Sequence, residues 1–138
     1  MIRLVCLGKN KPLYKTGVDE FTKRLSKYCK FELLESSSSK ESKNQGNLKG
    51  TIVALDEGGK EFTSQQFSKF MQKLNMESKD ITFVIGPAEG LSKEIKDKAN
   101  HTISLSKMTM PNQMAKLVFL EQLYRAFTII KGEPYHKD

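Results

Sequence analysis

Five short apolar runs, separated by helical or polar stretches, constrain the fold of this 138-residue chain most strongly. Several are almost continuously apolar rather than alternating, which is typical of strands in a parallel sheet that is covered on both faces. They span residues 2–7, 31–35, 51–55, 81–85 and 102–105. Strands that alternate with helices predict an α/β fold, in which right-handed crossovers build a mainly parallel sheet of five to six strands flanked by helices.

Four stretches between and after these runs have features of helices. Apolar residues repeat at helical spacing over residues 18–28 and 67–74, and Ser64 is the expected N-cap of the second stretch. Ser92 is expected to cap a short helix that runs to residue 99, and the final helix should begin near Pro111 and end before Gly132. The length fits one domain over residues 1–138.

The serine-rich segment at residues 36–50 is polar and lacks helical periodicity. A connection of this composition predicts a mobile loop, where a crossover would normally contain a helix.

The chain is basic, with 23 Lys and Arg against 16 Asp and Glu and a net charge of +7. This balance favours a polyanion such as RNA or an acidic membrane surface as partner, although ordinary solubility explains it equally well. The only two cysteines, Cys6 and Cys29, have no paired spacing. We therefore expect no disulfide framework, no metal site and a cytoplasmic location. No run is long enough to span a membrane.

The final helix is apolar around most of its circumference. The residues concerned are Met114, Leu117, Val118, Leu120, Leu123, Tyr124, Phe127 and Ile130. Such a helix must be covered on two sides, and a second copy of a small protein is the simplest second cover, which predicts a two-fold homodimer. The alternative is that the helix is deeply buried within one subunit.

Ligands of open parallel sheets gather beyond the carboxyl ends of the strands, where three loops qualify in this chain. They span residues 56–59, 86–90 and 106–110. Glycines in the first two would let a ligand approach the backbone closely, but they are also ordinary turn residues. The familiar glycine-rich nucleotide motifs GxGxxG and GxxxxGK[ST] are absent.

The C-terminal segment combines residues that could bind a nucleotide. Tyr135, His136 and Lys137 could form a frayed tail, or could contact a base and a phosphate. Arg125 lies in a largely apolar helix, where an unpaired guanidinium would be costly to bury. It should face either Glu121, one turn earlier, or a phosphate.

Three short motifs in the last third of the chain carry a family resemblance. The sequences LSKMT at 105–109, LYRA at 123–126 and PYH at 134–136 resemble those of the bacterial 23S rRNA pseudouridine-N3 methyltransferases of the SPOUT, or α/β-knot, class. The resemblance extends over most of the chain. It implies a C-terminal trefoil knot, a homodimer whose site is completed by the partner subunit, and S-adenosylmethionine as cofactor. The implied substrate is 23S rRNA in the assembled ribosome.

The resemblance also assigns site residues by position. The cofactor-binding residues would be Leu55, Gly86, Leu105, Ser106, Lys107, Met108, Thr109 and Met110, and the catalytic residues would be Arg125, Tyr135 and His136. In the implied reaction, N3 of a pseudouridine attacks the activated methyl group and S-adenosylhomocysteine leaves. His136 would accept the N3 proton or position the base, and Arg125 would stabilise the developing anion.

The chain departs from the family pattern at several places. Pro87 replaces the second glycine of a GG pair, Asn112 replaces a histidine, Lys116 replaces an arginine, and the serine-rich segment replaces a helix. The change to lysine predicts altered RNA contacts, because lysine lacks the planar fork of arginine. Two alternatives follow: a knotted RNA-binding paralogue with weak or no catalysis, and a doubly wound small-molecule binder without a nucleic acid partner.

Overall fold

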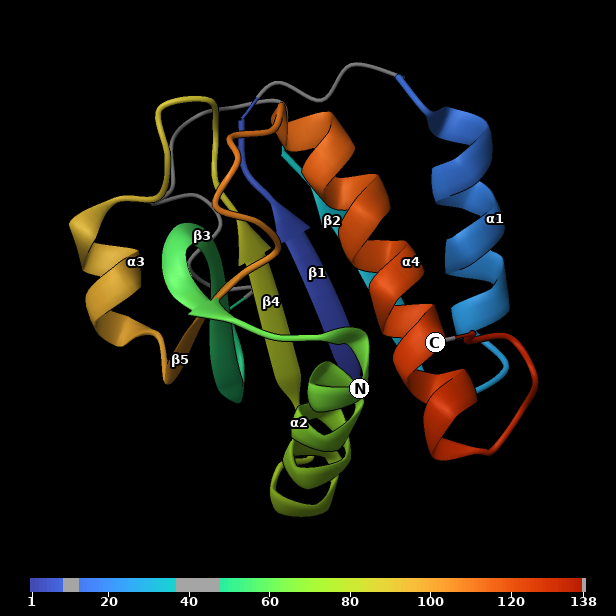
Figure 1. The fold of residues 1–138 in the computed structure, drawn as a ribbon. Coiled ribbons are helices and arrows are strands. Elements are labelled where there is room, and N and C mark those ends of the chain that lie inside the picture. Colours follow the sequence, from blue (N-terminus) through green and yellow to red (C-terminus); the bar gives the residue numbers. More distant parts are fainter. Residues whose placement is uncertain (9–12, 37–47, 138) are drawn as a thin grey trace.

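A computed structural model describes residues 1–8, 13–36 and 48–137 of the chain. Its described part contains a five-stranded, fully parallel sheet in the order β2-β1-β4-β3-β5 (Figure 1). The strands are β1 (Ile2–Cys6), β2 (Phe31–Glu35), β3 (Thr51–Glu61), β4 (Ile81–Ile85) and β5 (His101–Ser104). The predicted α/β fold with a mainly parallel sheet is confirmed. The serine-rich segment falls mostly on residues 37–47, which lie outside the described residues.

Apolar side chains cover both faces of the sheet, which explains why its strands are nearly continuous in apolar residues. All five residues of the central strand β4 are buried. Phe83 belongs to the larger core cluster, which includes residues of α1, α2 and α4, whereas its neighbour Val84 packs with Leu91 and Ile95 on the α3 side. Helices therefore flank both faces of the sheet (Figure 1).

The helices are α1 (Lys15–Leu25), α2 (Ser64–Glu77), α3 (Lys93–Lys98) and α4 (Asn112–Ile130). Ser92 caps α3 as predicted, since its hydroxyl accepts a hydrogen bond from the Ile95 amide. The predicted cap of α2 was wrong by one residue. Thr63 is the N-cap, and it forms a capping box with Gln66, while the Ser64 hydroxyl donates to Gln122 of α4 instead.

Strand β3 continues six residues beyond its predicted end, because its pairing with β5 resumes after an irregularity. Ile103 of β5 is in register with both Leu55 and Lys60, so residues 56–59 bulge out of the ladder. A Cβ atom on Gly59 would lie 2.7 Å from the carbonyl carbons of Thr102 and Ile103, so this close approach requires glycine. The bulge places Asp56 and Glu57 beyond the regular part of the strand.

Helix α4 lies against the sheet between α1 and α2 (Figure 1). Its Phe127 ring stacks on Tyr28, which follows α1, at 5.6 Å between centroids, and its Phe119 ring meets Phe67 of α2 at 6.3 Å. Much of the second cover predicted for this helix is therefore supplied within the subunit. Met114 remains 38% exposed. The homodimer and the trefoil knot stay predictions.

None of the helices in the described part of the chain is long and apolar enough to cross a membrane.

Candidate functional site

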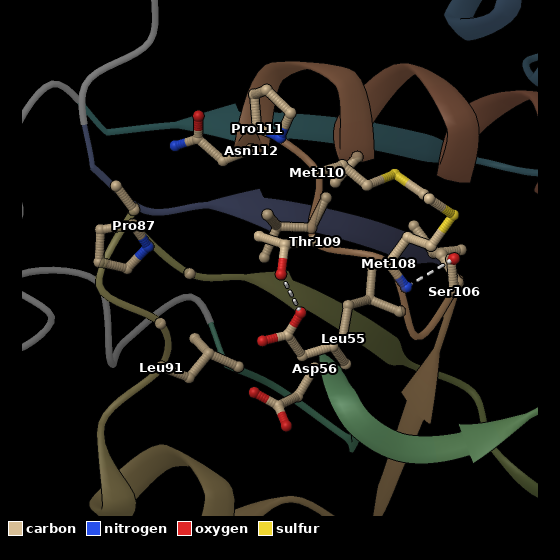
Figure 2. Close-up of a pocket in the computed structure, with 17 residues that line it drawn as sticks. Leu55, Asp56, Pro87, Leu91, Ser106, Met108, Thr109, Met110, Pro111 and Asn112 are labelled. Atoms are coloured by element: carbon tan, nitrogen blue, oxygen red, sulfur yellow. Dashed lines mark hydrogen bonds between the residues drawn. The ribbon is translucent and has the colours of Figure 1, made fainter.

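A cavity of about 530 Å³ lies at the carboxyl ends of β3, β4 and β5 (Figure 2). This is where the open-sheet rule places a ligand site. Its wall contains seven of the eight residues assigned to cofactor binding: Leu55, Gly86, Leu105, Ser106, Met108, Thr109 and Met110. Lys107 lies outside this wall, because its side chain is 83% exposed and pairs with Glu61 at 3.5 Å. The cavity thus gathers residues from all three predicted loops.

The loop after β4 forms one wall of the cavity through tight backbone packing. A Cβ atom on Gly86 would lie 2.8 Å from the Leu91 nitrogen and 2.9 Å from the Gly90 carbonyl carbon. The Gly90 amide donates to the Pro87 carbonyl at 2.8 Å, which closes a turn, and Gly90 has a φ of 91°. Pro87 therefore fits this turn, although it supplies no amide donor to the cavity.

The segment after β5 forms the opposite wall and is tied down by short-range hydrogen bonds. The Ser104 hydroxyl donates to the Ser106 carbonyl at 2.9 Å, and the Met108 amide donates to the Ser106 hydroxyl at 3.0 Å. The Thr109 hydroxyl donates to the Glu57 carboxylate at 2.8 Å, joining this segment to the end of β3 (Figure 2). These bonds fix the segment after β5 relative to β3.

The charged residues among those lining the cavity are both acidic, although the chain carries a net charge of +7. Asp56 forms an ion pair with Lys96 of α3 at 3.3 Å. Glu57 is exposed, and its described partner is the neutral hydroxyl of Thr109. The sequence placed both carboxylates in a candidate loop but assigned neither a role. An acidic cavity in a basic chain favours a cationic ligand.

The helix α4 contributes the remaining side of the cavity. Pro111, Asn112 and Ala115 from its first turn line the wall, together with Ile85, Ala88 and Leu91 from the β4 end. Two of the departures from the family pattern, Pro87 and Asn112, therefore face the candidate site.

Lys116 does not belong to this wall and is not available to RNA. Its side chain is 4% exposed, and its Nζ atom lies 2.7 Å from the Glu35 carboxylate at the end of β2. The prediction that Lys116 alters RNA contacts was wrong, because the residue forms a buried ion pair within the subunit. Burial also raises the pKa of the nearby Cys6 thiol to about 12, so this cysteine is an inert core residue rather than a nucleophile.

The three predicted catalytic residues gather at the other end of α4, around Glu121. The Arg125 guanidinium contacts both Glu121 oxygens, at 2.6 and 3.3 Å. The Tyr135 hydroxyl donates to Glu121 at 2.8 Å, and the Arg125 guanidinium lies 4.8 Å from the centre of the Tyr135 ring. Arg125 Nη1 lies 3.0 Å from His136 Nδ1. We call Glu121, Arg125, Tyr135 and His136 the tail cluster.

The electrostatics of the tail cluster follow from its central carboxylate. The hydrogen bond to Glu121 raises the pKa of Arg125, and partial burial together with the same carboxylate raises the pKa of Tyr135. Arg125 therefore pairs with Glu121, which is one of the two partners expected from the sequence; the other was a phosphate. Glu121 itself was named only as a partner of Arg125, and its contact with Tyr135 depends on how the tail folds back.

The tail after α4 is folded rather than frayed. Gly132 adopts a φ of 71°, which ends the helix, and the Glu133 amide donates to the Thr128 carbonyl at 2.9 Å. The Tyr28 hydroxyl, which lies beyond the end of α1, donates to the Glu133 carboxylate at 2.7 Å. These contacts hold Tyr135 and His136 against the C-terminal end of the helix.

The cavity and the tail cluster lie at opposite ends of α4. Asn112 lines the cavity, whereas Arg125 follows 13 residues later. At 1.5 Å per residue this separation is about 20 Å, which exceeds the reach of any side chain. One subunit therefore brings the predicted catalytic residues together, and it brings the predicted cofactor residues together, but it does not join the two groups.

Comparisons with known proteins agree with this architecture. The family described as "Predicted SPOUT methyltransferase" matches residues 1–136. A protein named ribosomal RNA large subunit methyltransferase H from Anaeromyxobacter sp. (strain Fw109-5) is 36% identical over 151 residues, and one of the same name from Clostridium perfringens (strain 13 / Type A) is 40% identical over 159. Each alignment covers 99% of both chains.

Solved structures share the fold at low sequence identity. A probable methylase family protein from Haemophilus influenzae Rd KW20 superposes with a TM-score of 0.63 and 12% identity, covering 99% of this chain and 70% of that one. The SpoU methyltransferase AviRb from Streptomyces viridochromogenes, solved in complex with the cofactor AdoMet, gives a TM-score of 0.52 at 12% identity, covering 94% and 58%. The family predicted from the three sequence motifs is confirmed, and the chain belongs to the SPOUT methyltransferases.

Proposed function

We propose that this protein transfers a methyl group from S-adenosylmethionine to N3 of a pseudouridine in the 23S rRNA of the assembled ribosome. The observation that carries the proposal is the cavity at the strand ends, whose wall contains seven of the eight residues assigned to the cofactor. The relatives named ribosomal RNA large subunit methyltransferase H point to the same class of substrate. We accordingly expect the protein to act in the cytoplasm.

The residues of the cavity fit this cofactor. A volume of about 530 Å³ lies within the range of roughly 300–1,000 Å³ typical of small-molecule sites. Leu55, Leu91 and Leu105 offer apolar surface to an adenine ring, and the charged residues lining the wall are carboxylates, which suit a cation. When bound, the cofactor supplies a methyl group on a sulfonium centre. The loops would hold it in a fixed orientation, and alignment of the reacting atoms should give most of the acceleration.

The hydrogen bonds of the tail cluster suggest a specific role for His136. A guanidinium has only donors, so His136 Nδ1 must accept the hydrogen bond from Arg125. In the neutral ring the proton then sits on Nε2, which makes Nε2 a donor. Of the two roles considered for His136, this favours positioning the target base through a carbonyl over accepting the N3 proton. Water or another base would accept that proton.

The charge on Arg125 can stabilise the anion that forms when the base loses its imide proton. In this structure Glu121 balances that charge. The Arg125 guanidinium lies over the Tyr135 ring, and the Tyr124 and Tyr135 rings form a T-shaped contact with centroids 4.8 Å apart. The part of the Tyr135 ring outside these contacts would stack on a base. Arg125, Tyr135 and His136 would thus contact the nucleotide, while the cavity would hold the cofactor.

The separation of about 20 Å between these groups supports a homodimer as the working form. In such a dimer the tail cluster of one subunit would complete the cavity of its partner. The outward side of α4, where Met114 is 38% exposed, offers apolar surface for this contact. The C-terminal trefoil knot implied by the resemblance belongs to the same proposal.

The departures from the family pattern do not favour an inactive RNA-binding paralogue. Lys116 is held in a buried ion pair, and Pro87 closes a turn that keeps the Gly86 wall in place. A small-molecule binder without a nucleic acid partner is not favoured either, because the chain belongs to a methyltransferase family.

Two measurements test the proposal. Calorimetry with S-adenosylmethionine should register binding, and radiolabelled methyl transfer should occur with 70S ribosomes and map to a 23S pseudouridine by mass spectrometry. The absence of binding would overturn the cofactor assignment. Binding without transfer to ribosomes, under conditions where a close relative is active, would instead support the paralogue. Sedimentation of the protein at working concentration tests the dimer separately.

A further inference from the structure

We infer that Glu57 makes the cavity selective for the positively charged methyl donor over its neutral product. This inference rests on the proposed function, since it concerns the ligand of the same cavity. The donor carries a sulfonium, an ammonium and a carboxylate, for a net charge of +1. The product has lost the sulfonium charge and is neutral overall. A charged residue in the wall therefore acts on the two ligands differently, whereas apolar walls act on both alike.

The two acidic residues of the wall differ in how much of their charge is already balanced. Lys96 lies 3.3 Å from Asp56, and the Gly58 amide donates to the same carboxylate at 3.0 Å. Within residues 1–8, 13–36 and 48–137, no lysine or arginine forms an ion pair with Glu57. Among these residues, Glu57 thus contributes negative charge that no ion pair balances.

The position of Glu57 is fixed, so this charge acts from a defined place. The hydrogen bond from Thr109 holds the carboxylate between the bulge of β3 and the segment that follows β5. A spherical cavity of about 530 Å³ would be about 10 Å across, so a cation near its centre lies within one Debye length of that carboxylate, about 8 Å at physiological ionic strength. The attraction therefore reaches the sulfonium without requiring direct contact.

The size of the effect is set by partial exposure. Glu57 is exposed, so water screens its field and one unit charge should change affinity about three- to tenfold. Once the methyl group has left, the sulfur is neutral and this contribution disappears. Glu57 would therefore strengthen donor binding without strengthening product binding, acting as a specificity-determining residue rather than a catalytic one.

The test compares donor and product binding by calorimetry in the full chain and in the variant Glu57→Gln. We expect the ratio of the dissociation constants, product over donor, to fall about three- to tenfold in the variant. Most of the change should be in the donor, with product affinity altered less than twofold. An analogue in which a protonated amine replaces the sulfonium should behave like the donor.

Two further variants keep the inference open to refutation. Glu57→Asp retains the charge and should preserve most of the wild-type ratio. Glu77→Gln makes the same change in net charge at the exposed C-terminal end of α2, outside the cavity wall, and should leave the ratio unchanged. Equal weakening of donor and product in Glu57→Gln, or an unchanged ratio, would overturn the role of Glu57. Absence of binding by the wild type would instead overturn the proposed function itself.

Discussion

The two groups of candidate site residues lie at opposite ends of α4 and are built in contrasting ways. At the N-terminal end the cavity is made largely from loops that follow three different strands, and its shape depends on close backbone packing around Gly86. At the C-terminal end the tail cluster is made from side chains that converge on one carboxylate, Glu121. The topology of the sheet thus determines which residues form the cavity. The spacing of residues within α4 and its tail determines which residues form the tail cluster.

In the proposed function, this difference separates cofactor binding from methyl transfer. Changes in backbone shape at the cavity should affect how tightly the cofactor binds, while changes of side chain in the tail cluster should affect the rate of transfer. A helix of 19 residues connects the two ends and is packed along its length by α1 and α2. The contrast can therefore be tested by single substitutions at either end.

The largest effect is expected for His136→Ala. Loss of the Nε2 donor and of the contact with Arg125 should reduce single-turnover methyl transfer about 100-fold or more. The dissociation constant for the cofactor should change less than twofold, because the proposed contact of His136 is with the target base and not with the cofactor. His136→Gln, which retains an N–H donor, should recover part of the rate.

The matched control for this change is His101→Ala. His101 is exposed at the start of β5, where its ring meets the edge of Phe70 at 5.1 Å, and it belongs to neither end of α4. Its replacement should leave the transfer rate within about twofold of wild type, as expected for surface positions away from a site. Equal losses of rate and affinity in His136→Ala would contradict the separation of the two ends.

The next effect concerns the ion pair that anchors the cavity end of α4. Glu35→Gln leaves the Lys116 ammonium, which is 4% exposed, without a balancing charge and should lower the free energy of unfolding by about 2–3 kcal/mol. Lys116→Met should cost less, about 1 kcal/mol, because the Glu35 carboxylate is 37% exposed and can be hydrated. Urea unfolding of both variants measures the difference. A larger loss in Lys116→Met would show that the lysine is not buried as described.

How far the sequence predicts this molecule depends on the range of the interactions involved. The strand positions followed from runs such as residues 81–85, because a strand buried on both faces is apolar at every position. The pairing of Arg125 with Glu121 was one of two alternatives that the sequence left open, the other being a phosphate, and the cavity followed from the rule that ligands lie beyond strand ends. Each of these depends on a local pattern or on a general property of parallel sheets.

The features that could not be predicted depend on contacts between distant residues. The continuation of β3 through Glu61 requires pairing with β5, and the polar residues involved look like an ordinary loop. Lys116 is buried because Glu35, 81 residues away, lies under the start of α4. The roles of Asp56 and Glu57 likewise depend on Lys96 and Thr109, which only the folded chain brings near.

A smaller effect at the cavity end is expected for Gly86→Ala. The added Cβ atom would lie 2.8 Å from the Leu91 nitrogen, so the loop after β4 must shift. We expect cofactor affinity, measured by calorimetry, to fall about tenfold. The rate of methyl transfer, measured with the cofactor at a saturating concentration, should fall much less. Gly58→Ala is the control, because its nearest atom is a side-chain oxygen of Asp56 at 3.1 Å. Unchanged affinity in Gly86→Ala would show that backbone shape does not limit binding there.

The smallest effect tests the contact that holds the tail. Partial burial and the hydrogen bond to Glu133 raise the pKa of Tyr28 to about 12, from a usual value of 10.0. The unfolded chain ionises at the lower value, so the stabilisation is complete below about pH 10 and is lost as the pH rises toward 12. Tyr28→Phe should therefore lose less stability than wild type between pH 10 and 12, measured as the shift in urea midpoint. Tyr14→Phe, at an exposed position without this contact, should follow wild type. Parallel declines in wild type and Tyr28→Phe would mean that the tail is not held through Tyr28, and its position would then depend on the contacts of Glu121 and on the Glu133–Thr128 backbone hydrogen bond.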